Sequence, residues 1–418
     1  MAKMNSNIIK NTSRLLVANV IAQVVGFAVY PILTRLYSPD DFGALNIFLT
    51  IGGIATLFAT AEYQNSIMLP KSEKSGVACF HIGFIITLIV TLLFFLSIPF
   101  AGPIANLLNV PQLSASYWML PIYILVISLW TLLNYWHTRN ERFTSVSAYQ
   151  ITQSVTGAGL KWGLARFASN GLIIGSVVAP LIALATNIAA TFRTAIRPLL
   201  TFDKDECRRM AREYVNFPKY SLPRTLINNL SGNLPILLLA PFFGAGYIGF
   251  FGMALSLAFR PLNIVSASLY QVFFQRAAEQ VQRKESIKSF FIKFLRNATL
   301  AVVPCFVILY FILPKLTEWF LGAGWNVTAE CIQLMLPWLA VVFIGSTIAF
   351  IPDIFQKQRT SAIIEVIYLI LRTCALLIGI LMNNFLLAVL LYCAVGFCVV
   401  GYQIVWYISL IRQYERSL

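Results

Sequence analysis

Charged residues are scarce in this chain of 418 residues. Only 11% of the residues are Asp, Glu, Lys or Arg, and 58% are hydrophobic, whereas charged residues make up about 25% of an ordinary soluble domain. So few charges cannot cover the surface of a water-soluble protein of this size. The composition therefore excludes a soluble enzyme and favours an all-α membrane protein in which one bundle uses the whole chain.

Residues that commonly carry catalysis or bind metals are also few. The chain has two histidines and seven cysteines, and no cluster of His, Cys, Asp or Glu has the spacing of a disulfide framework or a zinc site. No Walker loop, GxSxG elbow or GxGxxG turn is present. We therefore expect no catalytic residue, no metal ion and no cofactor.

Long apolar runs dominate what is present, and they decide how the net charge of +15 is interpreted. The basic residues lie between these runs, which argues against nucleic acid as a partner. About 20 apolar residues cross the hydrocarbon core of a bilayer. Twelve such runs predict twelve spans, the first of them retained and not cleaved as a signal peptide; they lie near residues 15–34, 44–66, 77–99, 116–136, 146–165, 171–192, 222–242, 246–272, 297–314, 330–352, 362–382 and 385–410.

The connections between the predicted spans differ strongly in charge. If the N-terminus is cytoplasmic, the cytoplasmic connections hold 24 Lys and Arg residues and the opposite connections hold 3. Cytoplasmic loops carry the excess of Lys and Arg, so we expect a multi-pass protein with both termini in the cytoplasm. One basic connection, residues 274–296, mixes Phe with cations and predicts a helix in the membrane interface that contacts anionic lipid.

An internal repeat relates the two halves of the chain. Residues 30–45 resemble residues 234–251, and Tyr63-Gln64 matches Tyr270-Gln271, at offsets of 204 to 207 residues; chance similarity of apolar helices is the alternative. An even number of spans in each half gives both halves the same direction in the membrane, with a pseudo-two-fold axis along its normal. We predict an N-terminal six-helix lobe, a basic cytoplasmic linker and a C-terminal six-helix lobe over residues 1–200, 201–221 and 222–418.

Two prolines occupy corresponding helices of this repeat. Pro31 lies in the first predicted span and Pro235 in the seventh. Proline inside a helix removes one backbone hydrogen bond and permits a bend. The pair predicts hinges for alternating access, or else two fixed kinks that neighbouring helices stabilise.

Charges inside the predicted spans are the strongest indication of a binding site. Arg260 and Arg372 fall near the middle of their spans, where an arginine costs about 2.5 to 3.5 kcal/mol and usually faces a cavity or an ion partner. Lys161 and Arg224 lie nearer helix ends, where they can reach the interface. These four cations predict a positive cavity and an anionic cargo, such as a phosphate or an acidic sugar.

Two carboxylates accompany these cations. Glu62 ends the second predicted span, and Glu365 precedes Arg372 by seven residues, two turns away on the same helix face. Both are candidates for ion coupling. A structural link from Glu365 to Arg372, or another ion pair across helices, is the alternative role for that arginine.

Several strings resemble the polysaccharide export family of O-antigen flippases, within the multidrug, oligosaccharidyl-lipid and polysaccharide exporter superfamily. These strings occur in the expected order at residues 33–43, 62–72, 217–223 and 271–275. The resemblance implies a bacterial inner-membrane flippase with a cationic cleft, whose cargo is an undecaprenyl-diphosphate-linked oligosaccharide. It also implies contact with membrane lipids and with other polysaccharide assembly proteins.

Two other functions remain open at this point. A multidrug or cation antiporter of the same superfamily would favour buried acids over buried arginines, and the spans show the reverse bias. A membrane polysaccharide polymerase would require a large outer loop or an acidic catalytic motif, and the sequence has neither.

Overall fold

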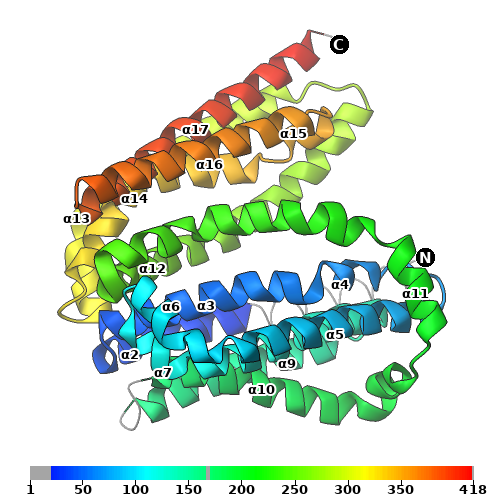
Figure 1. Ribbon diagram of the computed structural model, residues 1–418. Helices are drawn as coiled ribbons and strands as arrows, with labels where there is room; N and C mark the ends of the chain where they lie inside the picture. The colour runs from blue at the N-terminus through cyan, green and yellow to red at the C-terminus, as the bar shows by residue number, and fades with distance from the viewer. Residues whose placement is uncertain (1–19, 166–169, 417–418) are drawn as a thin grey trace. The chain divides into compact units, whose positions relative to one another are not determined.

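The computed structural model describes residues 20–165 and 170–416, and these residues form helices and connections without any strand. Figure 1 shows the helices in chain order. Their bounds are α2 Tyr30–Leu36, α3 Pro39–Thr60, α4 Tyr63–Ser66, α5 Glu73–Leu96, α6 Ala101–Leu107, α7 Pro111–Ser116, α8 Leu120–Arg139, α9 Phe143–Leu164, α10 Gly171–Thr191, α11 Lys204–Glu213, α12 Leu222–Gln282, α13 Lys288–Leu321, α14 Asn326–Thr347, α15 Ile351–Ile354, α16 Gln358–Leu381 and α17 Phe385–Glu415.

The helices confirm a polytopic all-α membrane protein. In the described part of the chain, nine helices are long and apolar enough to cross a membrane. One of them is α12, whose 61 residues hold two predicted spans joined at Gly244, where φ is 80° and ψ is 178°. The helical stretch Val20–Leu36 and the more polar α9 account for the remaining two predicted spans. The predicted cytoplasmic termini lie outside the described residues.

Contacts divide the chain into two compact units, Met1–Gly249 and Phe250–Leu418. In the first unit α3, α5 and α8 pack against one another, and α9 packs along α10. In the second unit α17 packs against both α14 and α16, and α13 packs mainly on α14. The division of the chain at residues 201–221 follows from the repeat and stays a prediction.

The start of α3 shows how a local sequence signal determines a helix boundary. Ser38 caps the helix by accepting a hydrogen bond from the Asp41 backbone amide, and the Asp41 carboxylate accepts from the Ser38 amide at 2.9 Å. Pro39 fits the first helical position because its missing N–H would have no partner there. Such a cap contributes about 1 kcal/mol.

The first unit contains a close crossing between two segments of the internal repeat. A Cβ atom on Gly43 would lie 1.8 Å from the Ala245 carbonyl oxygen, and one on Gly249 would lie 1.9 Å from the Pro39 carbonyl oxygen. Gly43 and Gly249 differ by 206 residues, as do Pro39 and Ala245, so the contact is reciprocal at the offset of the repeat. Only glycine lets two backbones approach this closely.

One expectation about the connections is wrong. Residues 274–296 do not form a separate helix in the interface, because α12 continues to Gln282 and α13 begins at Lys288. Aromatic packing explains the arrangement. Phe273 on α12 packs against Phe290 and Phe294 on α13, with ring centroids 5.1 Å and 4.5 Å apart. The basic stretch is therefore the joint between two long helices.

Candidate functional site

Arg372 lies near the middle of α16 and is buried among three aromatic rings of the second unit. Its guanidinium carbon is 3.8 Å from the ring centroid of Tyr368, 4.3 Å from that of Tyr392 and 4.9 Å from that of Trp338. Tyr368 precedes Arg372 by one turn of α16, whereas Trp338 comes from α14 and Tyr392 from α17. Packing of α17 against its two neighbours therefore closes a cage around the cation, defined here as Arg372 with these three rings.

The cage holds a positive charge without a negative partner. Arg372 is 7% exposed, and its Nε atom is buried without a hydrogen-bond partner. No carboxylate among residues 20–165 and 170–416 lies within ion-pairing distance of it. A desolvated cation–π contact contributes about 2 kcal/mol, so three rings offset much of the burial cost. They leave the hydrogen-bond donors of the guanidinium unused.

The expected link between Glu365 and Arg372 is not formed. Glu365 accepts a hydrogen bond from Nε2 of Gln403, on α17, at 2.9 Å. This contact directs the carboxylate to a side chain about three turns of α17 away from Tyr392. Glu365 is exposed apart from that contact, so its role as an ion-coupling group stays a prediction.

Arg260 lies in the second half of α12 and is half-buried. The residue before it, Phe259, packs edge-on against Trp338 with ring centroids 5.3 Å apart. This contact brings the α12 segment that carries Arg260 against one wall of the cage. Two of the predicted cations therefore belong to one neighbourhood of the second unit.

The other two predicted cations lie in the first unit. Lys161 is half-buried near the end of α9, and its Cγ atom would be 2.6 Å from a Cβ atom on Gly175. The stem of the lysine therefore packs directly on the backbone of α10. Arg224 lies in the first turn of α12 and is exposed. Their substrate-binding roles stay predictions.

Glu62 is buried, although the sequence placed it at a helix end where acids usually meet solvent. It is 6% exposed and occupies a break between α3 and α4, with φ of 62°. The amide nitrogens of Asn65 and Gln64 donate to its Oε2 atom, the latter at 3.4 Å. A left-handed conformation of a non-glycine residue is uncommon, so this carboxylate is held in place by its surroundings.

The two predicted hinges differ in their surroundings. The helical stretch from Val20 has a turn at Val29, two residues before Pro31, which occupies the first turn of α2. Pro235 is buried within α12, whose non-helical residue is Gly244 instead. The fold thus interrupts the first span near its proline, while the hinge function of both prolines stays a prediction.

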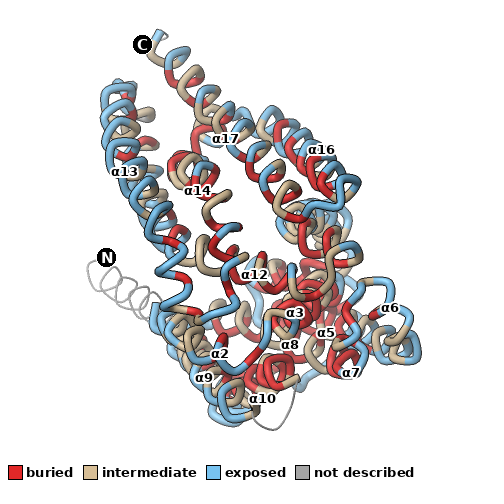
Figure 2. The backbone as a smooth tube through the Cα atoms, turned by 90° about the vertical axis from the view of Figure 1, so that its left-hand side faces the viewer, coloured by how far each residue is buried: buried red, intermediate tan, exposed pale blue. Residues whose placement is uncertain are grey.

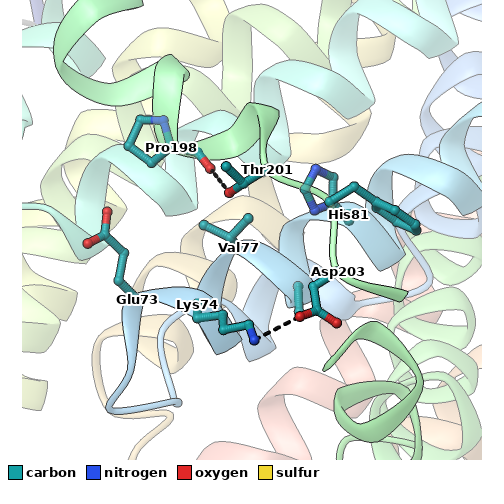
Figure 3. A pocket seen from close by; sticks show the side chains of 9 residues that line it. Glu73, Lys74, Val77, His81, Pro198, Thr201 and Asp203 are labelled. Atoms are coloured by element: carbon teal, nitrogen blue, oxygen red, sulfur yellow. Dashed lines mark hydrogen bonds and ion pairs between the residues drawn. The ribbon is translucent and has the colours of Figure 1, made fainter. Parts of the chain in front are cut away.

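A cavity of about 600 Å³ lies at one end of the first unit, between the start of α5 and the segment that leads into α11 (Figure 3). Lys74 Nζ and Asp203 Oδ2 are 2.7 Å apart across it. His81 Nε2 donates to the Leu199 carbonyl at 2.8 Å. Because these charges and donors already have partners within the fold, we assign this region to the attachment of α11 to α5.

Hydrogen bonds at this attachment also determine the acidity of two carboxyls. The Glu206 backbone amide and the Lys74 ammonium lower the pKa of Asp203. The Ser75 hydroxyl and the Arg209 guanidinium lower the pKa of Glu206. Both carboxyls are therefore ionised wherever α11 is attached at neutral pH.

The aromatic walls of the cage were not identified from the sequence. Tyr368 alone had a detectable signal, because a spacing of four residues places it on the same helix face as Arg372. Trp338 and Tyr392 are 34 and 20 residues away in the sequence. Only the packing of three helices brings them together. Among the described residues, no cluster of His, Cys, Asp or Glu could hold a metal ion.

Solved structures of membrane transporters share this fold. The inward closed conformation of the lipid II flippase MurJ matches with a TM-score of 0.72 and 15% identity, covering 96% of this chain and 89% of MurJ. An inward-facing multidrug resistance transporter of the MATE family, in the MOP superfamily, matches with a TM-score of 0.66 and 12% identity, covering 96% of each chain. At these identities the likeness shows the fold alone.

Two curated proteins are similar in sequence. Lipopolysaccharide biosynthesis protein WzxC of Escherichia coli (strain K12) is 23% identical over 329 residues, which are 76% of this chain and 64% of WzxC. Succinoglycan biosynthesis transport protein ExoT of Rhizobium meliloti (strain 1021) is 25% identical over 221 residues, which are 49% of this chain and 43% of ExoT. The chain thus spans less than two thirds of the length of either relative.

A family description matches most of the chain. The family described as "Polysaccharide biosynthesis protein" covers residues 32–330. This range begins in α2, contains every helix from α3 to α13 and ends in the first turns of α14. The chain therefore belongs to this family of polysaccharide biosynthesis proteins.

Proposed function

We propose that this chain is a flippase that moves undecaprenyl-diphosphate-linked repeat units of a polysaccharide, such as O-antigen, across the bacterial inner membrane. Its family and the names of its relatives associate it with polysaccharide biosynthesis and transport. A transporter fold with many spans suits a cargo that must cross the hydrocarbon core. In this proposal both termini are cytoplasmic, and the protein transports its cargo without catalysing a reaction.

The observation that carries the proposal is the unpaired charge of Arg372. Arg372 is buried against three aromatic rings, and its Nε donor has no hydrogen-bond partner among the described residues and is available to a ligand. Arginine binds phosphate through two parallel hydrogen bonds, which are stronger than bonds between neutral groups. A diphosphate carries the negative charge that would balance the positive charge of Arg372 in the cage. We assign Arg372 to the diphosphate, with Arg260 beside it in the same neighbourhood.

The remaining predicted residues have supporting roles in this proposal. Arg224 and Lys161 are further cargo-binding residues in this proposal, and Lys161 is fixed against Gly175. Glu62 is the first ion-coupling candidate, because its buried carboxylate accepts hydrogen bonds from the amide groups of Gln64 and Asn65. Glu365 is the second coupling candidate. Pro31 and Pro235 are the hinges of alternating access.

A deletion strain tests this function. We expect loss of surface polysaccharide and accumulation of lipid-linked repeat units on the cytoplasmic side of the membrane, both reversed by the intact gene. Susceptibility to cationic drugs should not change. A strain with normal surface polysaccharide and increased drug susceptibility would instead show a drug antiporter. Assembly of single repeat units at the periplasmic face without polymer would identify a polymerase.

A further inference from the structure

Helix α13 is the candidate span that the rest of the described protein covers least. In the most apolar 18-residue stretch of α13 only 6% of the residues are buried, compared with 33–56% for the corresponding stretches of the other eight candidate spans. Figure 2 shows exposed residues along most of α13. One side packs on α14, where Gln333 Nε2 donates to the Tyr310 carbonyl at 2.8 Å. The rest of this helix is available to lipid or to a ligand.

An apolar groove of about 750 Å³ runs between α13, α14 and α17. Leu295, Thr299, Val303, Phe306 and Tyr310 line it on α13. Their spacing of three or four residues places them along one helix face. Thr299 and Tyr310 are the only lining residues with polar side chains, so the groove suits a hydrocarbon chain.

A basic pocket of about 450 Å³ lies at the N-terminal end of the same helix. Its lining includes the cations Lys288, Lys293 and Arg296, together with Ile292. Lys288, Ile292 and Arg296 follow one another at four-residue intervals, and three further residues lead to Thr299 in the groove. One face of α13 therefore begins with cations and continues as an apolar surface.

One carboxylate lies beside the basic pocket. Glu415 of α17 accepts hydrogen bonds from the backbone amides of Ile287 and Lys288 at 2.9 Å and 3.1 Å, and from the Ser286 hydroxyl at 2.8 Å. This acid satisfies the N-terminus of α13. The three cations of the lining outnumber this acid, which favours an anionic headgroup.

The length of the groove distinguishes an anionic lipid with a long prenyl chain from an anionic phospholipid. Residues 295 to 311 rise by about 24 Å along the helix axis at 1.5 Å per residue. One leaflet supplies about half of a hydrocarbon core of about 30 Å. The groove is therefore longer than one leaflet of the hydrocarbon core is thick, which suits a chain longer than a phospholipid acyl chain.

From these observations we infer that the α13 face is a binding site for a polyprenyl diphosphate, with the diphosphate on Lys288, Lys293 and Arg296 and the prenyl chain in the groove. The inference rests on the proposed function, because it places a loading site for the same cargo on α13, a helix that contributes no residue to the cage of Arg372. The positive-inside count assigns this end of α13 to the cytoplasmic side. Lipid-linked cargo made on that side meets the cations first.

The test is photo-cross-linking with full-length protein in phosphatidylcholine nanodiscs. The probe is a polyprenyl diphosphate without sugar that carries a diazirine far from its phosphates. We expect labelled peptides from residues 295–311 and 397–408. Neutralising Lys288, Lys293 and Arg296 together to Gln should reduce labelling at least about fivefold. Lys204, Arg208 and Arg212 are exposed basic residues on α11, and their change to Gln is the matched control without effect.

A second variant fills the groove without disturbing the fold. Gly401 lines the groove, and a Cβ atom there would meet no atom within 4 Å. Gly401→Phe should therefore reduce labelling about fivefold and leave the melting temperature unchanged. Gly163→Phe on α9, where a Cβ atom also meets open space, is the control.

The outcomes separate this site from the proposed function. Equal competition by phosphatidylglycerol would identify a phospholipid site and overturn the inference. The inference would also be overturned if Arg372→Met abolished labelling while the triple Gln variant and Gly401→Phe left it intact. The proposed function would survive that result. If no protein were labelled and the deletion strain had normal surface polysaccharide, both the inferred lipid site and the proposed function would be contradicted.

Discussion

The end of α8 in the first unit holds a half-buried arginine and the middle of α16 in the second holds a buried one, and their charges are satisfied differently. Arg139 donates to the carbonyl oxygens of Ile67, Pro70 and Ser72 at 2.7, 2.6 and 3.0 Å. Arg372 packs against three aromatic faces, and its Nε atom has no acceptor among residues 20–165 and 170–416. One arginine closes a connection between helices, whereas the other keeps its donors.

This difference distinguishes an arginine that stabilises the fold from an arginine that can bind a ligand. Hydrogen bonds from a charged donor contribute about 1.5 to 3 kcal/mol each, so Arg139 stabilises the segment between α4 and α5. Cation–π contacts stabilise a charge without using its N–H groups. A ligand with oxygen acceptors can therefore bind Arg372 without breaking an existing hydrogen bond.

Replacing Arg139 should have the largest effect on the fold. Arg139→Met leaves three carbonyl oxygens without their donor, one of them on the fully buried Ile67. We expect a loss of about 3 kcal/mol or more, measured as thermal unfolding in detergent micelles. Arg212→Met, at an exposed position of α11, is the control. An unchanged melting temperature for Arg139→Met would contradict a structural role for Arg139.

Replacing Arg372 should separate function from stability. Arg372→Met keeps an unbranched apolar side chain and removes a buried charge without an ion partner among the described residues, so stability should change by less than about 1 kcal/mol. Surface polysaccharide in the complemented deletion strain should fall at least about tenfold, since about 1.4 kcal/mol of lost binding has that effect. Arg359→Met, on the same helix and exposed, should complement normally. Full complementation by Arg372→Met contradicts the assignment.

Sequence periodicity and charge were sufficient to predict the helices. Within residues 20–165 and 170–416, each of the twelve apolar runs corresponds to a helical segment, because spanning a membrane requires a long apolar helix whatever the tertiary packing. The reciprocal contact of Gly43 and Gly249 also follows the offset of the repeat.

Tertiary packing decided what the sequence could not predict. The burial of Glu62 depends on a left-handed break between α3 and α4, and no local pattern specified this conformation. The aromatic walls around Arg372 come from three helices that are distant in sequence. Apolar runs indicate that helices pack, but they do not specify which faces meet.

A double-mutant cycle can measure the cage directly. Tyr368→Leu removes one ring and should reduce the unfolding free energy, whereas Tyr368→Phe keeps the ring and should not. In the Arg372→Met background the effect of Tyr368→Leu should be smaller by about 1 to 2 kcal/mol, which is the size of a desolvated cation–π contact. Additive effects in the two backgrounds would mean that the ring does not stabilise the cation.

Acidification should weaken the attachment of α11 and leave the cage of Arg372 unchanged. We expect this effect to be smaller than those of the substitutions above. The folded-state pKa values of Asp203 and Glu206 are lowered, so their contribution is complete above the ordinary carboxyl pKa values. It is lost as the pH falls through the lowered values. Amide exchange in residues 204–213, corrected for intrinsic rates, should lose protection below about pH 4. Amides around Arg372 should not change, because the cage contains no carboxyl. Equal loss in both regions would contradict this difference.

Binding of the cargo lipid tests the central claim most directly. The affinity of purified full-length protein in nanodiscs would be measured for a polyprenyl diphosphate and for the matching uncharged polyprenol. If the unpaired charge of Arg372 binds the diphosphate, Arg372→Met should weaken binding of the diphosphate at least about tenfold and leave binding of the polyprenol unchanged. Equal affinity of the wild type and Arg372→Met for the diphosphate would contradict the claim.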